Sequence, residues 1–151
     1  MAKHLLSVLV QNHAGVLSRV SGLFSRRGFN IDSLAVGVTE DPEISRITIV
    51  VDGDEYTVDQ VTKQLNKLVD VLIVKRLEKS ESVSRELALI KVTATTQTRA
   101  EIIQIVEIFR AKIVDVSKST LTIEASGSLD KVSALEDMLK QYGIVEIVRT
   151  G

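Results

Sequence analysis

Residues 10–34 read VQNHAGVLSRVSGLFSRRGFNIDSL, and this stretch decides the fold. It contains the end of an apolar strand, a turn over residues 11–15, and apolar residues at the three- and four-residue spacing of an amphipathic helix. Gly28 follows, as glycine often does just past a helix C-terminus. A glycine-containing turn from strand to helix leaves free backbone N–H groups where the helix dipole also favours an anion. The sequence therefore predicts a binding site for a small anion or zwitterion rather than a reaction centre.

The composition excludes several classes of function. The 151 residues are 44% apolar and 26% charged with a net charge of −1, whereas a general nucleic-acid binder normally shows a strong basic excess. The absence of cysteine excludes disulfides, thiolate chemistry and cysteine-ligated zinc. No signal-peptide pattern or membrane-length apolar run is present, so we expect a cytoplasmic protein without membrane contacts.

Apolar periodicity predicts the order strand–helix–strand–strand–helix–strand twice. In the first half, strands are expected at residues 4–10, 30–39, 44–51 and 69–77, and helices at 15–27 and 55–68. In the second half, strands are expected at 85–95, 112–117, 120–126 and 144–150, and helices at 98–111 and 129–142. The serine-rich, charged segment 78–84 has the composition of a linker. The predicted fold class is α+β, with two tandem ferredoxin-like βαββαβ domains, residues 1–77 and 85–151.

Several of the predicted strands are apolar on both faces. Residues 5–10 and 71–74 show this pattern, although the two helices of each domain would cover only one face of its sheet. A soluble monomer rarely exposes such an apolar surface. We therefore expect association of domains, of subunits, or of both.

The turn and first helix also resemble a known family. Residues 12–19 match the pattern N-x-x-G-x-L-x-R of ACT domains, which bind amino acids. With the longer stretches 23–34, 45–49 and 63–71, residues 3–77 resemble the regulatory small subunit of acetohydroxyacid synthase, also called acetolactate synthase. The resemblance continues through residues 86–151, where 107–110 and 113–116 fit the second domain of that family.

The resemblance implies a non-catalytic regulatory subunit in branched-chain amino acid biosynthesis. Such a chain binds the catalytic large subunit, raises its activity and makes it sensitive to feedback by valine or another branched-chain amino acid. The implied catalytic partner uses thiamine diphosphate, Mg²⁺ and FAD, and the chain itself has no cofactor, metal site or catalytic residue. The implied assembly is a homodimer or a higher homo-oligomer.

The resemblance places the effector at an ACT–ACT dimer interface. It implies contributions from Asn12, Gly15, Val16 and Leu17 of one subunit and from Asn30 and Ile31 of the other. The physical chemistry of these residues agrees. Helix N–H groups would bind the effector carboxylate, an asparagine amide oxygen would accept from its ammonium group, and aliphatic side chains would surround its branched side chain. Ser18 and Gly37 are expected to modulate the interface or the feedback.

Several of these residues also have a simpler interpretation, and Gly15 could be an ordinary turn glycine. Asn12 could be no more than a helix cap, and Asn30 could be no more than part of the turn after Gly28. Ser18 could be a solvated helix residue, and Gly37 could mark an ordinary bulge. Arginines 19, 26 and 27 are interpreted as a solvated face with some role in partner docking. The acidic cluster at residues 52, 54 and 55 resembles a metal site, but a turn followed by a helix N-terminus explains it better.

Three other functions share features with this sequence. An ACT-type amino-acid sensor that regulates a different enzyme remains open. An acylphosphatase has the same element order, but it needs an arginine in the turn that here reads Asn12-His13-Ala14-Gly15. An RNA-recognition module needs exposed aromatic residues on its sheet, and the predicted strands offer none.

Overall fold

The computed structural model describes residues 2–151. The chain divides into two compact units, one up to Ser82 and one from Val83 onward. This division falls within the segment 78–84, where the described residues include one 3₁₀ turn, Lys79–Glu81. Each unit has the order βαββαβ, as predicted from the periodicity.

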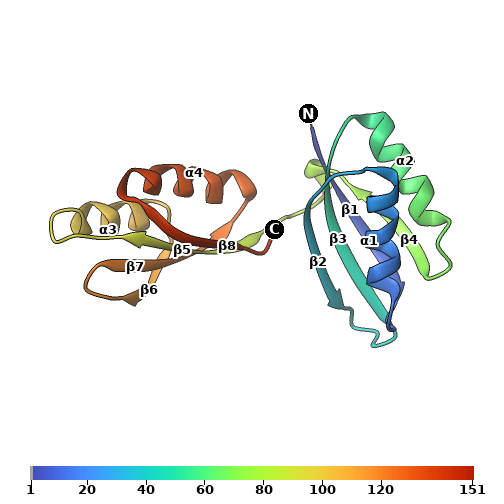
Figure 1. Ribbon diagram of the computed structural model, residues 1–151, viewed down its shortest axis with the longest axis horizontal. Helices are drawn as coiled ribbons and strands as arrows, with labels where there is room; N and C mark the ends of the chain where they lie inside the picture. Colours follow the sequence, from blue (N-terminus) through green and yellow to red (C-terminus); the bar gives the residue numbers. More distant parts are fainter. Residues whose placement is uncertain (1) are drawn as a thin grey trace. The chain divides into compact units, whose positions relative to one another are not determined.

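The first domain is a four-stranded antiparallel sheet with two helices on one side (Figure 1). The strands lie in the order β2-β3-β1-β4. In chain order the elements are β1 (Lys3–Gln11), α1 (Val16–Arg27), β2 (Ile31–Val38), β3 (Ile44–Asp52), α2 (Glu55–Asn66) and β4 (Val71–Leu77).

The second domain repeats this topology, with strands in the order β6-β7-β5-β8. Its elements are β5 (Glu86–Thr93), α3 (Arg99–Ile108), β6 (Lys112–Val116), β7 (Thr120–Gly127), α4 (Leu129–Leu139), a 3₁₀ turn (Lys140–Tyr142) and β8 (Ile144–Arg149). Even the irregularities correspond, because the register shift between Leu9 and Val10 has its counterpart between Lys91 and Val92. The fold class expected from the sequence is therefore confirmed.

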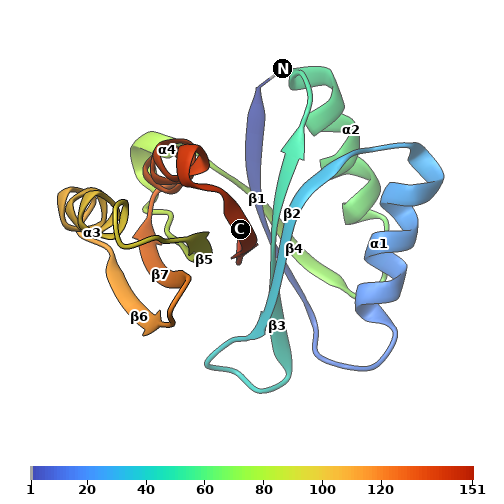
Figure 2. The ribbon, with the colours of Figure 1, turned by 60° about the vertical axis from the view of Figure 1, so that its left-hand side comes forward.

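The core of the first domain forms between the sheet and its two helices (Figure 2). Alternate residues of the central strands point toward the helices, because successive side chains of a strand face opposite sides of the sheet. They meet the apolar stripes of α1 and α2, and Phe24 and Phe29 stack edge to face at 6.0 Å. The fully buried apolar residues are Leu6, Val8, Val20, Phe24, Ile47, Ile49, Val51, Val58, Val61 and Leu65.

Several details differ from the sequence prediction. Helix α3 ends at Ile108 rather than at residue 111, β4 begins at Val71 rather than at residue 69, and β5 ends at Thr93 rather than at residue 95. Helix α2 ends at Asn66 rather than at residue 68, and α4 ends at Leu139, where a 3₁₀ turn follows in place of continued α-helix. Terminal turns often tighten in this way to bond their last carbonyls. Leu17 falls on the expected apolar face of α1 but is 43% exposed. It points beyond the area that the sheet of its own domain covers.

Strand β2 is an edge strand that neither helix fully covers. Its apolar side chains Leu34, Val36 and Val38 are all exposed. Across the same sheet, Leu72 and Ile73 are exposed as well. Unpaired strand edges with exposed apolar residues are sites of pairing with another chain. Association of the chain thus remains the expectation.

Candidate functional site

The candidate site starts at the first turn of α1, which no side chain caps. Gly15 occupies the N-cap position with φ of 89°, a left-handed conformation that glycine adopts without strain. The first intrahelical bond runs from the Arg19 N–H to the Gly15 carbonyl, at 3.0 Å. The N–H groups of Val16, Leu17 and Ser18 therefore have no acceptor within the helix and project from its positive end. An anion can bind there.

The Asn12 side chain does not cap this helix, so that simpler interpretation is wrong. Its Nδ2 donates to the carbonyl of Pro42 at 2.8 Å, and its backbone N–H donates to the carbonyl of Glu43, also at 2.8 Å. Both bonds tie the turn 12–15 to the turn between β2 and β3. Nδ2 of the amide thereby already donates, and Oδ1 is left as the atom that can accept a hydrogen bond from a ligand.

Asn30 and Ile31 lie at the opposite end of α1. Gly28 and Phe29 complete the helix terminus, with the Phe29 N–H bonded to the Phe24 carbonyl at 3.1 Å, so Asn30 is not required for that turn. Its Nδ2 donates instead to Asp32 at 3.0 Å. A helix of 12 residues is roughly 18 Å long, so one chain cannot bring Asn12 and Asn30 to one small ligand.

Two further predicted residues lie on the surface beside these ends. Ser18 is exposed in the first turn of α1. Gly37 pairs with Arg46 in regular register, and the register shift of this strand pair lies instead between Ile31 and Ser33, so the interpretation of Gly37 as a bulge is wrong. A Cβ at Gly37 would have no heavy atom within 4 Å.

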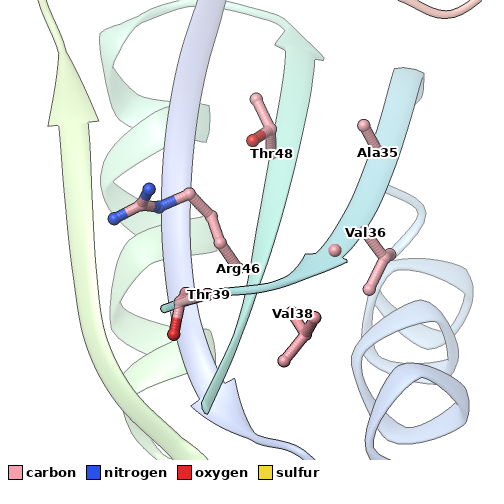
Figure 3. Close-up of a pocket in the computed structure, with 7 residues that line it drawn as sticks. Ala35, Val36, Val38, Thr39, Arg46 and Thr48 are labelled. Carbon is pink, nitrogen blue, oxygen red and sulfur yellow. The ribbon is translucent and has the colours of Figure 1, made fainter. Parts of the chain in front are cut away.

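Gly37 forms part of the floor of an open depression of about 370 Å³ on β2 and β3 (Figure 3). The side chain of Arg46 extends from β3 toward β1 beside it (Figure 3). The lining residues are Ala35, Val36, Gly37, Val38, Thr39, Arg46 and Thr48.

The equivalent turn of the second domain is closed by its own side chains. Thr95 and Thr98 exchange bonds, because each backbone N–H donates to the other residue's hydroxyl oxygen, at 2.9 and 3.1 Å. The Arg99 N–H donates to the Thr95 carbonyl at 2.9 Å. This turn has neither the asparagine nor the glycine of the first domain. Neither helix has a side-chain cap, but the Arg99 N–H of α3 is bonded to this turn, whereas the first N–H group of α1, that of Val16, has no such bond.

Two of the three residues in the acidic cluster, Asp54 and Glu55, belong to the start of α2, as interpreted from the sequence, whereas Asp52 is the last residue of β3. The Asp54 side chain accepts from the Thr57 N–H at 2.8 Å, and Glu55 pairs with Arg76. These contacts lower the pKa of both carboxyl groups: the bonds from Thr57 act on Asp54, and the bond from Arg76 acts on Glu55. Among residues 2–151 no group of three or more histidine, aspartate or glutamate side chains could hold a metal ion. Nor is any described helix long and apolar enough to cross a membrane.

Sequence comparison matches both domains to known families. Residues 6–73 match the model of the ACT domain of acetohydroxyacid synthase small subunit-like proteins, and residues 85–151 match the model of the small subunit of acetolactate synthase. A probable acetolactate synthase small subunit of Archaeoglobus fulgidus is 56% identical over 99% of this chain and 93% of its own length. The chain belongs to the acetolactate synthase small-subunit family.

Other members of the small-subunit family agree over nearly the whole chain. The acetolactate synthase small subunit of Mycolicibacterium smegmatis is 57% identical over 98% of this chain and 87% of its own length. The crystal structure of the Thermotoga maritima small subunit matches with a TM-score of 0.89 and 46% identity, covering 100% of this chain and 94% of that one. The resemblance noted from the sequence is thus confirmed.

Sequence reasoning missed one residue of the small-subunit turn. Asp70, directly before β4, binds Arg19 and lies 3.1 Å from Nε2 of His13. Arg19 is therefore not simply part of a solvated face, as its charge and its position on the helix had indicated. The signal was the last letter of N-x-x-G-x-L-x-R, which marks an arginine but does not name its partner 51 residues away.

Proposed function

We propose that this chain is the regulatory subunit of an acetolactate synthase and binds valine, or another branched-chain amino acid, where two ACT domains meet. Membership in the small-subunit family supports the regulatory role. In this proposal the chain contributes no catalytic residue. Thiamine diphosphate, Mg²⁺ and FAD belong to the catalytic large subunit, whose activity the chain raises and makes sensitive to feedback.

The observation that carries the proposal is the position of the two half-sites at opposite ends of α1. The N–H groups after Gly15 can bind a carboxylate, whereas Asn30 and Ile31 lie about 18 Å away at the other end of the helix. In a two-fold dimer the same surface meets itself, so antiparallel α1 helices would place each N-terminus against the partner's C-terminus. Such a dimer forms two complete sites.

The edge strand β2 supports this arrangement. Its Leu34, Val36 and Val38 are exposed, and Leu17 is exposed in the first turn of α1. A partner that covers these residues would remove apolar surface from water and enclose the effector side chain between aliphatic walls. The wall separates valine from smaller amino acids by only about 1–3 kcal/mol per methylene. The aliphatic walls alone therefore do not select among valine, leucine and isoleucine.

Calorimetric titration of the purified chain with valine, leucine and isoleucine tests effector binding, and light scattering gives the assembly size. We expect saturable binding of at least one of them to a dimer or larger oligomer. Addition of the chain to the catalytic subunit should raise acetolactate formation, and the same amino acid should then lower it. A strictly monomeric chain that binds none of the three would overturn the proposal.

A further inference from the structure

A carboxylate outside the proposed effector contacts holds the turn 12–15 from three directions. Asp70 is nearly buried, with 12% of its side chain exposed. Its Oδ2 accepts from Nη1 of Arg19, on the first turns of α1, and its Oδ1 lies 3.1 Å from Nε2 of His13, inside the turn. Its backbone carbonyl accepts from the Gln11 N–H at 2.9 Å, at the end of β1. Asp70 thus contacts the residues before, within and after the turn.

The second domain shows which of these contacts the fold itself needs. There, Gly143 takes the place of Asp70, and its carbonyl accepts from the Thr93 N–H at 2.9 Å, as the Asp70 carbonyl does from Gln11. The related domain therefore folds with the backbone bond alone. Among the described residues, such a carboxylate with side-chain contacts to the turn and to the following helix occurs only in the first domain.

The first turn also lacks the internal bonds that fix its counterpart. Thr95 and Thr98 hold the second turn by exchanging hydrogen bonds, whereas the first turn has Asn12, bound to Pro42, and Gly15, whose backbone is intrinsically free. A flexible turn must be ordered when a ligand binds, and that ordering lowers affinity. The ion pairs of Asp70 supply this order in advance.

We propose that Asp70 is a positioning residue of the effector site, which acts through Arg19 and His13 to hold the turn 12–15 in the geometry that presents the first N–H groups of α1. The inference rests on the proposed function, because it concerns the affinity of the same site. Asp70 does not contact the effector. Its pairing with Arg19 also neutralises a carboxylate close to a seat for anions.

The test compares valine binding by the full-length chain and by the variants Asp70→Asn, Arg19→Gln and the double variant. Each single change should weaken valine binding at least tenfold. The double variant should bind valine no more weakly than the single variant with the lower affinity, because both changes break the same pair, Asp70 and Arg19. Activation of the catalytic subunit without valine should stay within twofold of normal, which a general loss of structure would not allow.

Arg26→Gln is the matched control, because it removes an exposed arginine of the same helix outside the pair. Its valine affinity should be unchanged. If Asp70→Asn fails to fold, Arg19→Gln and His13→Gln carry the test, since 59% and 51% of these side chains are exposed.

The outcomes separate the two proposals. Folded variants that bind valine as tightly as the unaltered chain would overturn the role of Asp70 and leave the proposed function intact. Fully multiplicative effects in the double variant would show that Asp70 and Arg19 act independently, and would also overturn it. An unaltered chain that binds no branched-chain amino acid would overturn both proposals.

Discussion

Arg76 and Arg149 occupy the same position in the two sheets. Arg76 pairs with Leu6 and Arg149 pairs with Ala88, and each of these partners lies three residues before the register shift of its strand. Both arginines extend over the helix-covered face and bind the second helix of their domain, Arg76 through Glu55 and Arg149 through Glu136. The two halves of the chain thus share one ion-pair position as well as one topology.

The partners at the start of the first strand differ between the domains. His4 lies beside Arg76. Because a guanidinium only donates, Nδ1 of His4 accepts from Nη2 of Arg76 at 2.9 Å, and Nε2 of His4 donates to the Gly53 carbonyl at 3.0 Å. Glu86 lies beside Arg149, which donates to it from Nε at 3.1 Å and also from Nη2. The second domain therefore has a carboxylate beside its arginine where the first has an imidazole.

This difference predicts unequal effects of the same substitution. Only 6% of the Glu86 side chain is exposed, so Arg149→Gln leaves a buried carboxylate without its cation and should destabilise the second domain by about 3 kcal/mol. Arg76→Gln should have a smaller effect, because 71% of its partner Glu55 is exposed to water. Urea unfolding of the full chain, with hydrogen exchange of β5 and β1 to assign each domain, measures both. Equal losses would contradict the assignment, and the double variant Glu86→Gln, Arg149→Gln should recover part of the stability.

Much of the fold could be predicted from the sequence because local signals agreed with one another. The alternation of Leu6 and Val8, the helical spacing of Val16 and Val20 and the glycine at position 28 all indicate the same element order. The exact helix ends could not be predicted, because they depend on which carbonyls the next turn can bond.

The candidate site was less predictable, for a physical reason. Residues 12–15 indicate a ligand-binding turn from the sequence alone, because they are adjacent to one another. Asp70 becomes part of the same turn only when β4 returns beside β1, and no local pattern encodes that contact. The turn of the second domain shows the same limit, since its closure depends on the particular geometry of Thr95 and Thr98.

The start of α2 gives a prediction for acid. The pKa of Asp54 is lowered from its ordinary 3.8 by the N–H and hydroxyl of Thr57, so its carboxylate stabilises the helix above that pH, and the contribution is lost as pH falls through the lowered value. Asp54→Asn keeps a capping oxygen but removes the charge. The melting temperature of this variant should lie below that of the unaltered chain at pH 7, and the difference should shrink as the pH falls below 3.8 and through the lowered pKa. Glu40→Gln, an exposed turn residue, should show no such convergence, and a pH-independent difference would contradict the prediction.

Substitution of Gly15 should separate charge from backbone strain. Any side chain at φ of 89° is strained by about 1–2 kcal/mol, although asparagine and aspartate tolerate this region best. Gly15→Asp also places a carboxylate where the effector's own carboxylate would bind, whereas Gly15→Asn has nearly the same shape without the charge. We expect the aspartate variant to lose feedback by valine and keep its activation of the catalytic subunit. The asparagine variant should retain a weakened response. Normal inhibition of the Gly15→Asp variant at ordinary valine concentrations would show that the site lies elsewhere.

The two-chain composition of the site predicts rescue between defective chains. In the proposed dimer, Gly15 of one chain and Asn30 of the other meet in each site. A chain with Gly15→Asp and a chain with Asn30→Ala should each fail to bind valine as homodimers.

Their heterodimer, isolated with two different affinity tags, contains one site with both changes and one intact site. It should therefore bind about one valine per two chains with near-normal affinity, which calorimetry can measure. A doubly tagged dimer of two Gly15→Asp chains is the control and should not bind. If the heterodimer also fails, both residues act within a single chain, which the length of α1 makes incompatible with one small ligand, and the shared site would have to be abandoned.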